Sequence, residues 1–153
     1  MLKKIAVFGL VTLNTILLNL PAPIVQAQKS TAFTCINVSG SRIYGNDNPI
    51  SVGKRIRRPI YGVYLNSHES TCEITDKNVT QLNFSLTIAD NSNMQMAEFS
   101  VFLDGKIAKK VQVKRGTELT FSVPLKKRSK NFAIEAQKQG KSDTLYFLKY
   151  EAK

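Results

Sequence analysis

Alternation of apolar and polar side chains is the dominant pattern of this chain after residue 27. It is clearest in residues 82–88, where Leu82, Phe84, Leu86 and Ile88 alternate with asparagine, serine and threonine. Because successive side chains of a strand point to opposite sides, such a segment buries one face and exposes the other. The helical period is nearly absent, so the pattern predicts an all-β protein.

Further segments show the same kind of pattern and are bounded by Gly, Asn, Asp or Pro, which favour turns. The segments predicted to be strands are 33–38, 60–65, 71–75, 99–103, 106–114, 119–123, 132–137 and 144–150. Asp104-Gly105 joins two of them and predicts a tight hairpin, since both residues tolerate positive φ. About eight or nine short strands without an internal repeat predict one β-sandwich domain. The pattern does not give the order of the strands.

The first 27 residues predict export. Lys3 and Lys4 precede an apolar stretch at 5–20, prolines follow, and Val25-Gln26-Ala27 supplies small side chains for a signal peptidase. A signal anchor is the alternative, but polar residues interrupt the apolar stretch and prolines end it. We expect a signal peptide at 1–27 and a single secreted or periplasmic domain at 28–153, without a transmembrane segment.

Two cysteines lie in the predicted exported part, Cys35 and Cys72. An even pair in an oxidising compartment predicts one disulfide. A metal site would need three or four ligands, and His68 is the only histidine. The glycines are dispersed and form no phosphate-binding loop. We therefore expect neither a metal nor a cofactor.

The formal net charge is +11, from 22 Lys and Arg against 11 Asp and Glu, and two of these lysines belong to the predicted leader. Such an excess attracts polyanions, whether acidic polysaccharide, anionic lipid or nucleic acid at low salt. Solubility alone is the other explanation of the charge. Nucleic acid is not expected as a partner, because no recognition helix is predicted.

Catalytic patterns are absent from the sequence. Any Ser-His or Cys-His arrangement would have to use His68, and the nearby Ser67 and Ser70 lie in no nucleophile-elbow motif. Both cysteines are predicted to be oxidised, and no pair of carboxylates stands out by context. We expect the protein not to be an enzyme.

The densest basic cluster, residues 54–58, directly precedes two tyrosines, Tyr61 and Tyr64. Guanidinium groups of Arg57 and Arg58 can bind carboxylate or sulfate, and tyrosine rings can cover apolar sugar faces. The alternative is that these charges merely keep a sheet edge from pairing with another chain.

Taken in order, the motifs of this chain resemble the NPCBM domains, carbohydrate-binding modules found beside glycoside hydrolases. Shared features are a glycine followed by His and a small residue, an apolar strand ending near Asp, a Phe-x-Val strand turning at Asp-Gly-Lys, and a closing pair of strands around a Gly/Asp turn. The segments that carry these features are 62–74, 82–89, 97–106, 132–136, 140–143 and 145–151. The similarity spans residues 44–152.

The resemblance implies a galactose-binding-like jelly-roll sandwich that binds sugar on loops at one rim. Two departures are that the chain has no tryptophan and that no catalytic domain is attached to this stretch. On this reading the domain binds a glycan, anionic or on a surface, without catalysis. The predicted ligand-binding residues are Tyr61, Tyr64, Asn66, His68, Arg57, Arg58 and Asp90. His68 could instead be a buried imidazole and Asp90 a turn cap, and the alternative function is a basic structural or interaction protein of the envelope or matrix.

Overall fold

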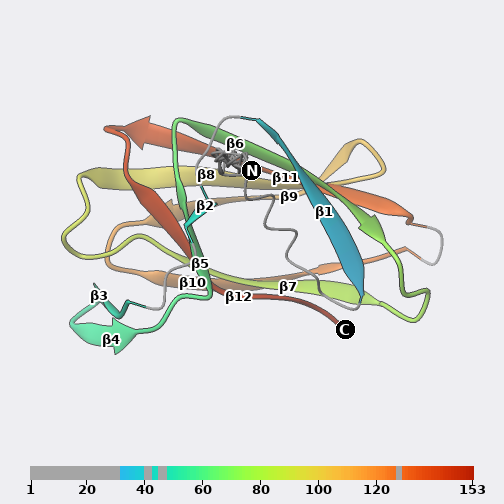
Figure 1. Cartoon of the computed structure of the whole chain (residues 1–153), viewed down its shortest axis with the longest axis horizontal. Helices are drawn as coiled ribbons and strands as arrows, with labels where there is room; N and C mark the ends of the chain where they lie inside the picture. The colour runs from blue at the N-terminus through green and yellow to red at the C-terminus, as the bar shows by residue number, and fades with distance from the viewer. Residues whose placement is uncertain (1–31, 40–42, 45–47, 127–128) are drawn as a thin grey trace, which may run out of the picture.

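The alternating segments form the strands of two packed antiparallel sheets (Figure 1). A computed structural model of the chain describes residues 32–39, 43–44, 48–126 and 129–153. The predicted signal peptide lies outside the described residues. Among the residues described, no helix is long and apolar enough to cross a membrane.

One sheet, called sheet A, has five strands in the order β1–β6–β11–β8–β9. They are β1 (Phe33–Ser39), β6 (Ser67–Ile74), β11 (Asn131–Gly140), β8 (Met94–Leu103) and β9 (Lys106–Lys114). The opposite sheet, sheet B, has the order β10–β7–β12–β5–β2. Its strands are β10 (Glu118–Pro124), β7 (Gln81–Thr87), β12 (Thr144–Ala152), β5 (Tyr61–Tyr64) and β2 (Ile43–Tyr44).

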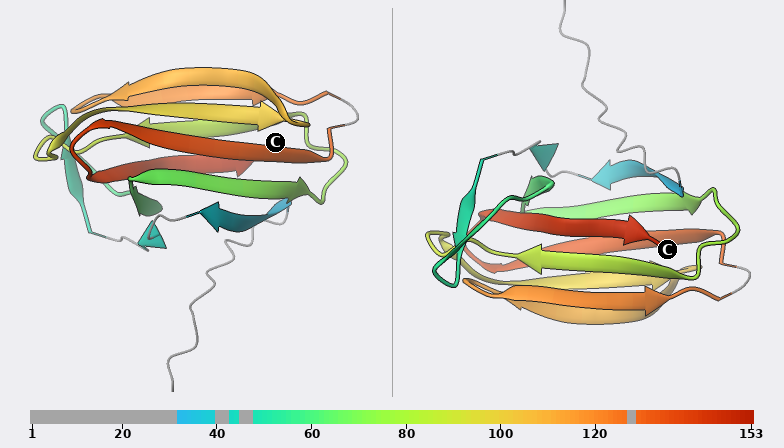
Figure 2. Two further views of the ribbon diagram at one scale, coloured as in Figure 1. Left: turned by 90° about the horizontal axis from the view of Figure 1, so that it is seen from above. Right: turned by 90° about the horizontal axis from the view of Figure 1, so that it is seen from below.

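A separate hairpin of β3 (Ile50–Val52) and β4 (Arg55–Arg57) lies at one end of the two layers (Figure 2). Most neighbouring strands are not consecutive in sequence, so the chain crosses repeatedly between the sheets, as in a jelly roll. The predicted all-β sandwich is confirmed.

Each of the nine predicted strand segments overlaps an observed strand, but three very short strands were not predicted. β2, β3 and β4 have two or three residues each, too few for alternation to be recognised. β6 also begins at Ser67, four residues earlier than predicted. Its inward side chains there are His68 and Ser70, which are polar, so the apolar alternation fails while the strand continues.

The predicted hairpin between β8 and β9 is confirmed. Asp104 has a φ of 49° and Gly105 a φ of 78°, the left-handed conformation at both central residues that suits the twist of the flanking strands. The turn leaves β9 as an edge strand of sheet A, carrying four exposed lysines. Lysines along an edge discourage pairing with other chains.

Aromatic side chains from both sheets fill the space between them. Tyr150 of β12 contacts Phe84 of β7 with a ring-centroid distance of 5.1 Å and Phe33 of β1 at 4.9 Å. Phe99 of β8 meets Phe147 of β12 at 5.8 Å. The Tyr150–Phe33 and Phe99–Phe147 pairs join rings of opposite sheets, so these contacts hold the two layers together.

The predicted disulfide is confirmed between Cys35 of β1 and Cys72 of β6. The two residues are directly opposite each other in the antiparallel ladder and face the core. The bond therefore fastens the edge strand β1 to the sheet.

Removal of the disulfide should destabilise the domain. The chain-entropy model assigns about 4 kcal/mol to closing a loop of this length, so we expect Cys35→Ala/Cys72→Ala to lose up to that much free energy of unfolding. Urea denaturation of the double variant, and of the reduced wild type as its control, measures the effect. An unchanged urea midpoint in both the double variant and the reduced wild type would contradict a stabilising role of the disulfide.

Candidate functional site

Four connections between the sheets come together at one end of the sandwich, called the loop end. They are residues 65–66, 88–93, 115–117 and 141–143. Asp143 ties three segments of this end together: its carbonyl accepts a hydrogen bond from Leu65 N at 2.8 Å, and its carboxylate accepts one from Asn93 N at 2.7 Å. The loop end is therefore a connected surface rather than a set of independent loops.

Asp90 fixes the β3–β4 hairpin to the loop end. Its carboxylate accepts hydrogen bonds from Ser51 Oγ at 2.6 Å, Gly53 N at 2.9 Å and Lys54 N at 3.2 Å. These bonds, led by that from Ser51, lower the pKa of Asp90. Gly116 allows the close approach, since a Cβ there would lie 2.8 Å from Asp90 Oδ1. The structure thus gives Asp90 the role of a turn cap.

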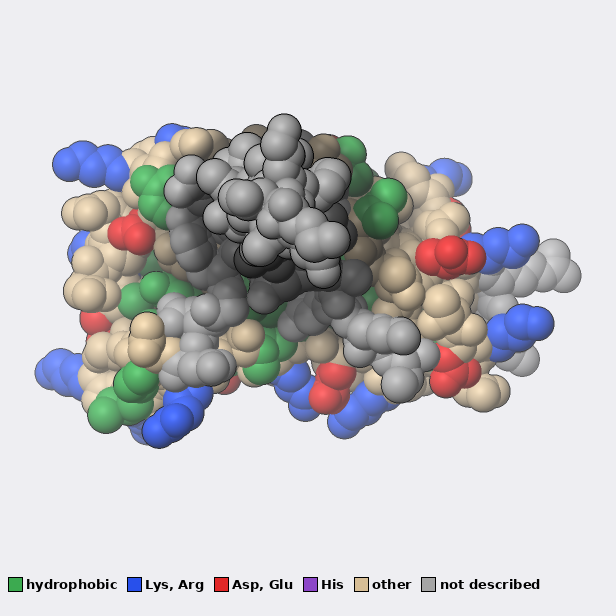
Figure 3. All heavy atoms as spheres, viewed as in Figure 1, with side chains coloured by type: hydrophobic (Ala, Val, Ile, Leu, Met, Phe, Trp, Pro, Cys, Tyr) green, Lys and Arg blue, Asp and Glu red, His purple; other side chains and the backbone are tan. Residues whose placement is uncertain are grey.

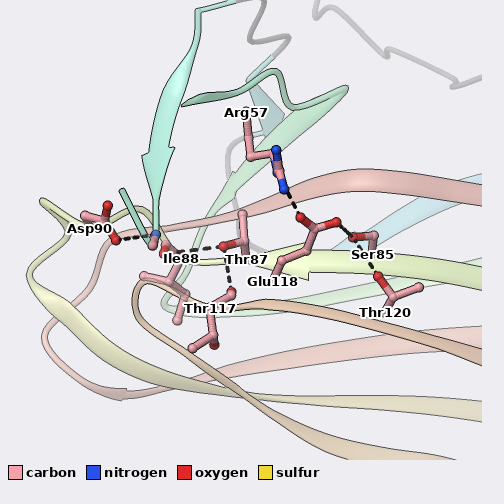
Figure 4. A network of polar contacts seen from close by, with 9 residues as sticks. Arg57, Ser85, Thr87, Ile88, Asp90, Thr117, Glu118 and Thr120 are labelled. Carbon is pink, nitrogen blue, oxygen red and sulfur yellow. Dashed lines mark hydrogen bonds and ion pairs between the residues drawn. The ribbon is translucent and has the colours of Figure 1, made fainter. Parts of the chain in front are cut away.

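A second carboxylate, Glu118, holds the other side of the hairpin (Figure 4). Arg57 Nε donates to Glu118 Oε2 at 2.9 Å, and Ser85 Oγ donates to Oε1 at 2.9 Å. Thr120 Oγ1 donates in turn to Ser85 Oγ at 3.2 Å. Partial burial raises the pKa of Glu118, but the hydrogen bonds and the arginine charge outweigh it, so its pKa is lowered.

A groove of about 450 Å³ lies between the hairpin and the edge strand β10. Its polar lining comes from Arg55, Arg57, Glu118 and Thr120, with the backbone of Gly53 and Gly116 beside them. The groove therefore offers two guanidinium groups, one carboxylate and one hydroxyl to a ligand. We call it the hairpin groove.

Tyr64 and Asn66 form a different part of the loop end. Tyr64 is exposed at the end of β5, and Asn66 Oδ1 accepts hydrogen bonds from Ser142 Oγ at 2.8 Å and Lys138 Nζ at 3.3 Å. β5 is separated from β10 by β12 and β7, so Tyr64 lies about 14 Å across the sheet from the hairpin groove. One monosaccharide cannot touch both.

Tyr61 and His68 do not line the surface, so their prediction as rim residues is wrong. Tyr61 is buried, and its ring stacks on Phe147 at a centroid distance of 4.3 Å. His68 is buried on the inward side of β6, where its Nε2 lies 2.8 Å from Ser70 Oγ. Burial lowers the pKa of His68 to about 4 and raises that of Tyr61. Alternation decides both positions, because each residue falls on the core side of its strand.

On the face shown in Figure 3, the basic side chains do not gather into one patch. Lysine and arginine side chains lie there at several separate places among acidic and neutral ones. Arg57 faces the hairpin groove, whereas Arg58 is exposed outside its lining. The predicted set is therefore divided: Arg57 and Asp90 at the hairpin, Tyr64 and Asn66 at the turn after β5.

Sequence reasoning missed Arg55, Glu118 and Thr120. Arg55 belongs to the basic cluster already noted, and alternation in β10 marks Glu118 and Thr120 as outward. Nothing in the sequence places β10 beside the hairpin. Within the described residues, no group of three or more His, Cys, Asp or Glu side chains is arranged to hold a metal ion.

The buried histidine should make stability depend on pH. The unfolded chain binds a proton near pH 6.5 but the folded protein only near pH 4, so the free energy of unfolding falls as pH drops through this window. Over the whole window, the free energy of unfolding should fall by about 3 kcal/mol. This pH dependence should be weaker in His68→Gln, and urea unfolding at pH values between 7 and 4 measures it in both proteins. An NMR titration giving His68 a pKa near 6.5 would refute the burial argument.

Loss of the Asp90 carboxylate should loosen the hairpin. Because its folded pKa is depressed, the stabilisation is present above the ordinary value of 3.8 and is lost as pH falls through the lower folded value. We expect Asp90→Asn to speed amide exchange at Gly53 and Lys54 at neutral pH. Asp76→Asn, at the opposite end of the sandwich, is the control. Equal exchange in both variants would show that Asp90 does not anchor the hairpin.

Comparison with known proteins reveals similarity of fold rather than of sequence. No family model and no curated protein sequence matches the chain. The CBM51 module of Clostridium perfringens GH95, solved with methyl-galactose, superposes with a TM-score of 0.61 at 12% identity, over 78% of this chain and 92% of that one.

Two further solved structures agree. The tandem CBM51 modules of the Streptococcus pneumoniae family 98 glycoside hydrolase give a TM-score of 0.58 at 14% identity, over 93% of this chain and 51% of that one. CBM51-2 of C. perfringens ZmpB, solved with GlcNAc, gives a TM-score of 0.55 at 10% identity, over 77% of this chain and 28% of that one. The chain therefore shares the β-sandwich fold of these three modules, and such a sandwich is what its resemblance to NPCBM domains implies.

Proposed function

We propose that this protein is an exported, non-catalytic carbohydrate-binding domain and that its ligand binds in the hairpin groove. The shared fold supports this class of function, since the similar modules were solved with methyl-galactose and GlcNAc. The observation that carries the proposal is the lining of the groove. Arg55, Arg57, Glu118 and Thr120 meet there in a space of about 450 Å³, within the usual range of roughly 300–1,000 Å³ for small-molecule sites.

The lining suits a sugar that carries an acidic group. Guanidinium groups form paired hydrogen bonds with carboxylate or sulfate, and a carboxylate accepts from sugar hydroxyls. Arg57 is already paired with Glu118 at 2.9 Å, which fixes both side chains before a ligand arrives. Arg55 forms no such ion pair among the described residues, although its charge helps to lower the pKa of Glu118, so its guanidinium group is available to bond the ligand. Without the two lysines of the predicted leader, the net charge of +11 becomes 11 − 2 = +9, which adds a long-range attraction for such polymers.

The groups of a Ser-His or Cys-His catalytic arrangement lie outside the groove. The single histidine is buried beside Ser70, and both cysteines are joined in the disulfide. The proposal of binding without reaction follows the similar modules, which were solved with sugars. Tyr64 offers an apolar surface about 14 Å across the sheet, which a longer oligosaccharide could reach.

The alternative is a basic interaction protein held to polyanions by charge alone. The exposed lysines of β9 favour it: Lys106, Lys109, Lys110 and Lys114 lie along one edge strand. They form no defined pocket, so attachment through them should depend steeply on salt. At about 0.5 M salt the screening length is only a few Å, and such attachment should be lost while binding in the groove persists.

Titration calorimetry with acidic and neutral oligosaccharides tests the site. Each of Arg55→Ala and Arg57→Ala should weaken binding of a uronate-containing oligosaccharide by about tenfold, the loss of one charge-assisted hydrogen bond. Arg55→Lys should recover only part of the affinity, because it lacks the planar fork. Lys77→Ala, which removes an exposed charge at the opposite end, is the matched control.

Full affinity in the double variant Arg55→Ala/Arg57→Ala would remove the hairpin groove as the site. If Lys77→Ala weakens binding as much as the groove variants do, and 0.5 M salt abolishes it, the charge-only alternative holds instead.

A further inference from the structure

The outward face of sheet A carries an apolar row that crosses all five strands. The strand registers place its members directly opposite one another in the order Ile36, Thr71, Ala133, Phe102 and Ile107. The isoleucines at its two ends are 66% and 61% exposed. With neighbouring strands about 4.8 Å apart, the row is about 19 Å long. This surface is unusual for the outer side of a sandwich, which is normally polar.

The centre of this apolar row is hollowed and acidic. A groove of about 390 Å³ lies over Thr71, Ala133 and Phe102 and is bordered by Glu69 and Glu135. These two glutamates face each other across β6 and β11, an arrangement that destabilises a sheet. Neither forms an ion pair with any lysine or arginine of the part that the structure describes, although basic residues outnumber acidic ones two to one in the chain. The domain therefore leaves this negative charge unmatched.

A complementary surface exists at the β3–β4 hairpin. Every second residue from Lys54 to Ile60 is exposed, and these four residues are basic and apolar in turn: Lys54, Ile56, Arg58 and Ile60. Arg55, between the first two, is exposed as well. Ile56 is 76% and Ile60 44% exposed. Hydrophobic and basic side chains lie next to each other at the corner where Figure 1 places β4 (Figure 3). We call these four residues the basic strip.

We propose that the basic strip of one copy of this protein docks on the acidic apolar row of a second copy. Isoleucines of the strip would cover the half-buried Phe102 and the exposed Ile107, and its cations would neutralise Glu69 and Glu135. The extended part of the strip is β4, and even if fully extended the segment from Lys54 to Ile60 would span at most about 20 Å, close to the length of the row. The pairing accounts for four of the six exposed large hydrophobic side chains in the part of the chain that the structure describes.

The two surfaces cannot meet within one molecule. Asp90 and Glu118 hold the hairpin at the loop end beside sheet B, whereas the row is on the outward side of sheet A. The contact is therefore head-to-tail between copies, with different patches on the two partners. Such an interface does not close on itself in a dimer and can extend into longer assemblies.

Sedimentation equilibrium in 0.15 M salt tests the proposal on the purified protein. The wild type should show a mass that rises continuously with concentration, without a plateau at the dimer. Ile56→Glu removes the strip and Glu135→Lys removes the row, so each variant alone should remain monomeric. Both positions are on the surface, and unchanged circular dichroism and melting temperature confirm that each variant folds.

Mixing the two variants gives the decisive result. The Glu135→Lys protein keeps an intact strip and the Ile56→Glu protein keeps an intact row, so the mixture should form 1:1 dimers that do not grow further. Lys77→Glu and Glu151→Lys are charge-matched controls placed away from both surfaces and should assemble like the wild type. The milder change Ile56→Ser should weaken self-association by about tenfold.

Three outcomes would overturn the proposal. They are a wild type that stays monomeric up to about 1 mM, single variants that still assemble, or a mixture that fails to pair. If the wild type is monomeric but binds anionic phospholipid vesicles in an Ile56-dependent way, the strip is a membrane contact instead. The variants also separate this proposal from sugar binding, because Ile56 and Glu135 do not line the hairpin groove.

Discussion

The packing of aromatic rings between the two sheets is the interaction on which the rest of this structure depends. Tyr150 contacts rings of five neighbours, among them Phe33 and Phe132 from sheet A and Phe84 and Phe147 from sheet B. Without these contacts each sheet would expose a broad apolar face to water, a loss that the hydrogen bonds within the sheets could not offset. The disulfide, whose two Sγ atoms lie 3.5 and 3.3 Å from the Tyr150 hydroxyl, secures the edge of the same cluster.

A rigid sandwich lets short polar segments at its end be positioned by a few carboxylates. Asp90 and Glu118 hold a hairpin that has only two three-residue strands and little core of its own. That arrangement keeps Arg55 and Arg57 beside β10 and leaves Ile56 in water. One small element thus contributes to two of the proposed binding surfaces, the polar hairpin groove and the basic strip.

Particular residues show where alternation along the sequence predicts the buried side of a strand correctly and where it does not. Residues 82–88 alternate regularly, and their predicted strand is correct because one face meets the core and the other meets polar neighbours. His68 and Tyr61 looked like rim residues by type, yet both fall on the core side of their strands. In β12, the register shifts between Phe147 and Lys149, so Tyr150 turns inward although simple alternation from Phe147 would place it outside.

The sequence by itself determined the all-β class, the strands of four or more residues, the Asp104-Gly105 turn and the pairing of two cysteines, because each depends on side chains close together along the chain or on simple counting. Apart from the β8–β9 hairpin, only the tertiary structure decided which strands are neighbours, and with that the hairpin groove and the opposed Glu69 and Glu135. Those features join residues distant in sequence, and their distances follow from strand order, register and bulges, which are set by the packing of the whole core.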